Sequence, residues 1–147
     1  MDRETIGTSG LDPALVDAYR TADYHVTGCE PAFVLHVDER SPALAALYAA
    51  TGSACSAWLT ACNPASVLWT DEANDVAQRS LKLRLARGGI RGIDGFGADP
   101  HGRWPAEPGV LALGLDQALA GELARDLGQN ALLWVAADTI PRLLLLR

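Results

Sequence analysis

Apolar residues recur at helical spacing in four stretches of the chain, each beginning beside a residue that can cap a helix. Asp12 and Ser41 each precede a proline, a combination that is typical of a helix N-terminus. Glycine follows three of the stretches, where it permits the left-handed conformation that often ends a helix. The predicted helices span residues 13–22, 42–51, 71–87 and 116–127.

Extended segments rich in β-branched, aromatic or small apolar residues lie between these helices. Segment 54–62 carries no charge, as expected for a central strand that is covered on both faces. Segment 90–96 alternates with glycine and predicts only a weak or bulged strand. The remaining extended segments are 24–28, 32–37, 110–115, 131–137 and 140–146.

The order of the elements predicts an α+β fold that is close to α/β. Helices that alternate with strands favour parallel neighbours, whereas the short connections at 98–102 and 138–139 require antiparallel ones. A mixed sheet of about five or six strands with helices packed on it satisfies both requirements. Residues 1–10 are polar and aperiodic and predict a flexible tail, so residues 11–147 form a single globular domain.

Composition agrees with a single domain, because the 147 residues are 49% hydrophobic and only 20% charged. No apolar run approaches the ~20 residues of a membrane span, and the first residues lack the apolar segment of a secretory signal. Cys29, Cys55 and Cys62 are too few for a disulfide scaffold. We therefore expect a cytoplasmic protein that is not a membrane protein.

The net charge of −6 is unevenly distributed along the chain. Residues 1–73 carry 10 acidic and 3 basic residues, whereas residues 74–147 carry 8 acidic and 9 basic ones. This acidic half argues against nucleic acid as a partner, because phosphate neutralisation dominates that affinity. Several basic residues gather near helix 71–87, where a solvated helix face explains them: Arg79, Lys82, Arg84, Arg87 and Arg91.

Two carboxamides lie on the inward side of helix 71–87. Asn74 and Gln78 share one face with Leu81 and Leu85, at about 100° per residue. A buried amide without partners costs of order 1–3 kcal/mol, so both side chains must be hydrogen-bonded. They either bond to the backbone of the loop 63–69 or line a polar pocket.

Three further carboxamides stand at the ends of elements. Asn63 precedes Pro64 at the end of the central strand, where its side chain either caps the following turn or meets a ligand. Gln129 and Asn130 follow the glycine that ends the last helix, and their amides could simply satisfy that helix end. The loop after Asn63 has no glycine and precedes two acidic residues, so a phosphate site is disfavoured there.

Segment 101–108 contains an imidazole, a guanidinium, an indole and a carboxylate, and two prolines constrain it. Glu107 is the candidate general base or polar anchor, and the alternative is that it pairs with Arg103 or caps backbone amides. Trp104 is placed to stack on a ligand. The histidines and cysteines show no metal-ligand spacing, and no nucleotide-binding motif is present, so neither a metal nor a cofactor is expected.

Several of these residues form strings that resemble a small bacterial family classed as a domain of unknown function. The strings are T-A-x-N-P at 60–64 and G-Q-N-A followed by two apolar residues and Trp at 128–134, together with Asn74, Trp104 and Glu107-Pro108. The resemblance covers about residues 30–147 and implies no activity, cofactor or substrate. The family has an aromatic residue where Cys62 stands and a serine where Pro108 stands, which puts hydroxyl chemistry at the second position in doubt.

Three hypotheses remain open. In the first, the domain binds a small polar molecule through candidates from the whole set: Asn63, Asn74, Gln78, Trp104, Glu107, Gln129 and Asn130. In the second, it is a structural or protein-interaction module with no ligand, and it could form a homodimer through the apolar run 143–146. In the third, it is a metal-independent enzyme with Glu107 as general base.

Overall fold

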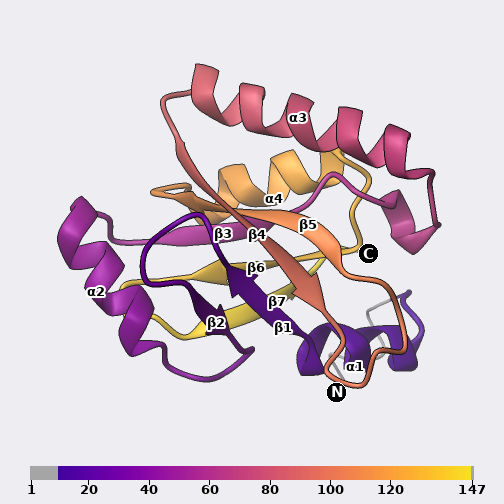
Figure 1. Ribbon diagram of the computed structural model, residues 1–147, viewed down its shortest axis with the longest axis horizontal. Coiled ribbons are helices and arrows are strands. Elements are labelled where there is room, and N and C mark those ends of the chain that lie inside the picture. The colour runs from indigo at the N-terminus through magenta and orange to yellow at the C-terminus, as the bar shows by residue number, and fades with distance from the viewer. Residues whose placement is uncertain (1–9, 147) are drawn as a thin grey trace.

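Four α-helices begin at the expected caps in the computed structural model, which describes residues 10–146 (Figure 1). The side chains of Asp12, Ser41, Thr70 and Asp116 each accept a hydrogen bond from a backbone N–H in the first helical turn. The helices are α1 (Pro13–Thr21), α2 (Pro42–Thr51), α3 (Asp71–Arg87) and α4 (Gln117–Asp126). The predicted flexible tail lies outside the described residues except for Gly10.

Seven strands form one sheet, in the order β2-β1-β4-β5-β3-β6-β7. They are β1 (Asp23–Val26), β2 (Phe33–Leu35), β3 (Ser56–Leu59), β4 (Arg91–Ala98), β5 (Glu107–Leu113), β6 (Ala131–Val135) and β7 (Pro141–Leu145). The α+β class and the single sheet with packed helices are confirmed. The expected weak strand is β4, which with 8 residues is longer than any other described strand.

The described residues form seven strands, slightly more than the predicted five or six. The expectation of parallel neighbours in the sheet is wrong, because every pairing among these strands is antiparallel. Helices α3 and α4 do connect strands that run in the same direction. However, β5 lies between β3 and β4, and β3 lies between β5 and β6. The segment from β3 to β6 is therefore a split β-α-β-β-α-β motif, which the order of elements alone does not distinguish from a sheet with parallel neighbours.

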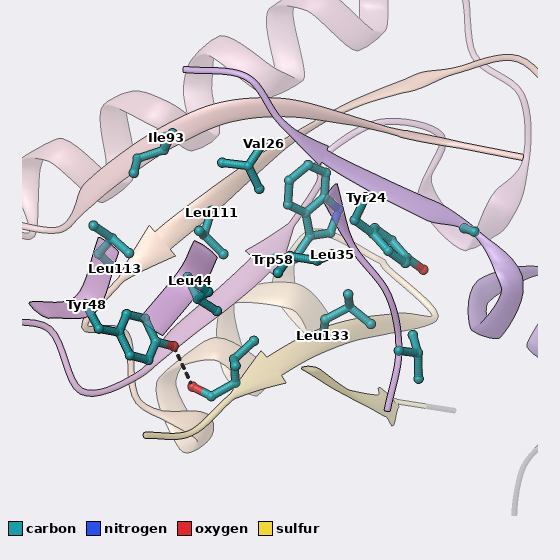
Figure 2. Close-up of a cluster of buried hydrophobic side chains, with 13 residues drawn as sticks. Tyr24, Val26, Leu35, Leu44, Tyr48, Trp58, Ile93, Leu111, Leu113 and Leu133 are labelled. Carbon is teal, nitrogen blue, oxygen red and sulfur yellow. Dashed lines mark hydrogen bonds between the residues drawn. The ribbon is translucent and has the colours of Figure 1, made fainter. Parts of the chain in front are cut away.

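The sheet separates two hydrophobic clusters. Helices α3 and α4 cover one face, where Leu81 and Leu123 pack with Ala57 and Leu59 of β3. Figure 1 shows both helices on the same side of the sheet. The opposite face holds Trp58 and the residues of Figure 2. Strict alternation along β3 thus sends consecutive side chains into different clusters.

The sheet curls around this second cluster, so that its edges approach each other at one end. There the backbone N–H of Asp38 donates to the carbonyl of Pro141 over 2.8 Å, which links the chain after β2 to β7. Helix α2 covers the curled interior at this end with Leu44 and Tyr48 (Figure 2). The Tyr48 hydroxyl donates to the Val135 carbonyl over 3.1 Å. Helix α1 lies beside the far ends of the strands (Figure 1).

Candidate functional site

A cavity of about 260 Å³ lies inside the curled sheet, beneath helix α1. Its walls are mainly apolar and aromatic, and they come from segments at both ends of the chain. Helix α1 contributes Leu15, Ala18 and Tyr19, and Leu143 of β7 contributes to another wall. Four of the predicted site residues line it: Asn63, Trp104, Glu107 and Gln129.

Glu107 begins β5, where it is paired across the ladder with Gly97 of β4. Its Oε2 accepts a hydrogen bond from Asn63 Nδ2 over 2.7 Å. Its Oε1 has no hydrogen-bond partner in the described part of the chain. Burial raises the pKa of Glu107, and the bond from Asn63 offsets part of this rise. The cavity therefore contains a carboxylate whose burial is only partly offset by its hydrogen bond from Asn63.

Asn63 holds the turn after β3 in place, and its backbone has φ 45°. Such a left-handed conformation is tolerated by asparagine better than by most residues. The side-chain Oδ1 accepts from the Trp69 backbone over 2.9 Å and from Asn74 Nδ2 over 2.8 Å. Asn74 Oδ1 in turn accepts from the Asn63 backbone over 2.9 Å. Asn74 thus bonds the backbone of the loop, and it does not line the cavity.

Gln78 also lies behind the cavity wall, on the inward face of α3. Its Oε1 accepts from the Ala61 backbone over 3.0 Å. Its Nε2 is buried and has no hydrogen-bond partner among residues 10–146. Gln78 therefore supports the end of β3 and does not reach the cavity.

Gln129 and Asn130 follow α4 and have different surroundings. Gln129 Nε2 donates to the Cys62 carbonyl over 3.0 Å, which orients the side chain, and its Oε1 has no partner among the described residues. Only 8% of Gln129 is exposed. Asn130 does not line the cavity, and its Nδ2 donates to Ser66 Oγ over 3.1 Å and to the Tyr19 hydroxyl over 3.3 Å. Asn130 thereby ties α1 to the loop after Asn63.

The turn before Trp104 is organised by a buried carboxylate. Asp99 accepts hydrogen bonds from the backbones of His101 and Arg103, and Arg103 Nε donates to its Oδ2 over 2.7 Å. These donors, chiefly the Arg103 guanidinium, lower the pKa of Asp99. The suggestion that Glu107 pairs with Arg103 is therefore wrong, because Asp99 holds that guanidinium. The turn presents Trp104 to the cavity.

Sequence reasoning missed the aromatic floor of the cavity. Trp58 and Tyr24 meet edge to face, with ring centroids 5.7 Å apart. Gly95 and Gly109 lie against Trp58 on β4 and β5, where a Cβ atom would clash with the indole. Glycines in neighbouring strands are a signal for close packing of a large side chain. No local signal places α1 over the cavity.

No group of three His, Cys, Asp or Glu side chains in residues 10–146 is arranged to hold a metal ion. None of the described helices is long and apolar enough to cross a membrane.

Fold and site together define an α+β domain whose curled antiparallel sheet encloses an aromatic, acidic cavity. The chain belongs to the family described as protein of unknown function (DUF3293), whose model matches residues 59–132. The resemblance to a domain of unknown function is thus confirmed, over a shorter range than residues 30–147. No curated protein and no solved structure matches the chain.

The family match coincides closely with the split β-α-β-β-α-β motif. It runs from the last residue of β3 to the second residue of β6. All seven candidate site residues lie within it, whereas α1, which covers the cavity, lies outside. The carboxylate and carboxamide groups of the cavity therefore belong to the family domain, and much of its apolar cover is supplied by the preceding segment.

Proposed function

We propose that the domain binds a small molecule in the cavity beneath α1. The observation that carries this proposal is the pair of unpaired acceptors, Glu107 Oε1 and Gln129 Oε1, on the wall of a mainly apolar space. A ligand that donates hydrogen bonds to these two atoms would pair them while its apolar part leaves water.

The rigidity of the polar wall supports the proposal. Asn63 holds the Glu107 carboxylate through one amide hydrogen and is itself held by Asn74 and the Trp69 backbone. Gln129 is oriented by its bond to the Cys62 carbonyl. Because other residues of the chain already hold both side chains, binding would require little ordering of the site. Asn74, Gln78 and Asn130 act in this proposal as supports behind the wall.

A cavity-filling substitution tests the proposal. Ala18→Trp places a large side chain into the cavity from α1, whereas Ala46→Trp makes the same change at an exposed position of α2. A diverse library of small fragments is screened by thermal shift against the wild type and both variants. The expected effect is large enough to detect in this screen, because a ligand at about 100 times its Kd stabilises the native state by roughly 2.7 kcal/mol.

We expect fragments that stabilise the wild type and Ala46→Trp but have no effect on Ala18→Trp. Two-dimensional amide NMR of the wild type should place their shifts at residues around the cavity. If no fragment discriminates between the two variants, the cavity is not a binding site, and the interaction-module hypothesis takes its place.

The burial of Glu107 favours a second candidate, in which a bound molecule is also converted. A carboxylate with a raised pKa can accept a proton near neutral pH more readily than an ordinary one. Mass spectrometry of each bound fragment after prolonged incubation tests this candidate. Conversion by the wild type and retention of the unchanged fragment by Glu107→Gln would support catalysis.

The cellular location and the partners of the protein are further proposals. All three cysteines are free, which favours a cytoplasmic location. The formal charge of −6 does not favour a nucleic-acid partner. A homodimer through the edge of β7 is a further proposal, and light scattering coupled to size-exclusion chromatography distinguishes a dimer from a monomer.

A further inference from the structure

The described lining of the cavity carries a negative charge and no positive charge to balance it. Glu107 is the only carboxylate among the described residues that line it, and no Lys, Arg or His is among them. The nearest guanidinium along the chain, that of Arg103, is paired with Asp99. Glu107 is partly buried, and a carboxylate in such a place without a cationic partner favours a ligand that carries positive charge.

The unpaired acceptors are held by neighbouring residues of the chain. Glu107 is bound to the side chain of Asn63, and Gln129 is bound to the carbonyl of Cys62, directly before it. Gln129 Oε1 is an amide oxygen and can only accept hydrogen bonds, and Glu107 Oε1 only accepts them when the carboxyl is ionised. An ammonium group has three donors and no acceptor, so it complements this pair.

Aromatic rings form much of the remaining wall. Tyr24, Trp58 and Trp104 all line the cavity, and the faces of such rings attract cations. The indole N–H groups of the two tryptophans have no partner in the described residues, but they are neutral and do not offset the carboxylate charge. The leucines and alanines of the lining leave room for an apolar group.

We propose that the ligand is a small amine, whose ammonium group is bound by Glu107 and Gln129 and whose aliphatic or aromatic body lies against the apolar walls. This inference rests on the proposed function, because it requires the cavity to be a binding site. It excludes small carboxylates and phosphates as ligands, since these anions would meet Glu107 without any balancing cation in the lining.

Three matched sets of compounds test the inference. Each set combines one body (benzyl, 2-phenylethyl or 3-methylbutyl) with an amine, a hydroxyl or a carboxylate. Isothermal titration calorimetry should show at least one amine binding about tenfold or more tightly than its alcohol, and no binding of the carboxylates. The same titrations on Glu107→Gln should reduce amine affinity about tenfold or more and reduce alcohol affinity much less.

Glu122→Gln is the matched control, because it removes one negative charge at an exposed position of α4. It should leave every affinity unchanged. The inference is overturned if alcohols bind as tightly as amines, if both Glu variants weaken amine binding equally, or if no amine binds. Fragments that bind the wild type but not Ala18→Trp would still uphold the cavity as a binding site, so the two failures are distinguishable. If Glu107→Gln does not fold, the comparison of amines with alcohols on the wild type decides the question.

Discussion

The packing of Trp58 against two glycines leads to a quantitative prediction for stability. A Cβ atom at position 109 would overlap Cζ2 of the indole and would lie 2.5 Å from Cε2 and 2.9 Å from Nε1. Carbon atoms in good contact are about 3.5–4.0 Å apart, so Gly109→Ala must displace the ring. Trp58 is only 5% exposed and is held by Tyr24, which leaves it little room to move.

Two opposing effects determine how much Gly109→Ala changes the free energy of unfolding. Overpacking a well-packed core typically costs about 1–3 kcal/mol. Replacing glycine by alanine also restricts the unfolded chain, which stabilises the native state by about 0.4–1 kcal/mol. A direct clash with a buried ring belongs at the upper end of the overpacking cost. After the gain from the restricted unfolded chain is subtracted, the free energy of unfolding should fall by about 2 kcal/mol. For a domain of this size such a loss lowers Tm by about 4–8 °C.

Gly97→Ala is the matched control for this substitution. Gly97 lies two residues from Gly95 in β4, but a Cβ atom there would be 3.8 Å from Cδ1 of Tyr24, an ordinary contact. The stability of Gly97→Ala should equal or slightly exceed that of the wild type. Differential scanning calorimetry and urea unfolding of both variants measure the difference. Equal stability of Gly109→Ala and Gly97→Ala would refute the packing argument.

Three further predictions concern buried or ionised groups. Because burial raises the pKa of Glu107, the native state keeps a proton that the unfolded chain loses between the ordinary and the raised pKa. The free energy of unfolding should therefore fall as pH rises through this window, and urea unfolding across it should show no such component in Glu107→Gln; an unchanged slope would argue against burial as the cause. The lowered pKa of Asp99 has the opposite effect, since its stabilisation is lost as pH falls through that pKa, so Asp99→Asn should lower the thermal midpoint at neutral pH and weaken the acid dependence. A thermal midpoint of Asp99→Asn equal to that of the wild type would show that the bonds from Arg103 to Asp99 do not stabilise the native state. Tyr48→Phe leaves Ser56 Oγ and the Val135 carbonyl without the hydroxyl they share and should cost about 1–3 kcal/mol in urea unfolding, whereas a loss near zero would mean that water replaces it.

The candidate site was predictable from the sequence in part, because polar residues at the ends of elements must find partners. That rule identified Asn63, Glu107 and Gln129, which the structure brings to one cavity wall. It could not separate them from Asn74, Asn130 and Gln78, which satisfy backbone or neighbouring side chains behind the wall. The distinction depends on where each side chain lies relative to segments that are far away in the sequence.

The sequence by itself determined the helices and strands, because caps, glycine stops and apolar periodicity act within a few residues. Asp12, Ser41 and Asp116 cap helices as their local sequence predicts. Only the tertiary structure decided the antiparallel strand order, the curl of the sheet and the position of α1 over the cavity. These features depend on pairing and packing between distant segments, such as the contact of Asp38 with Pro141, and no local pattern encodes such a pairing.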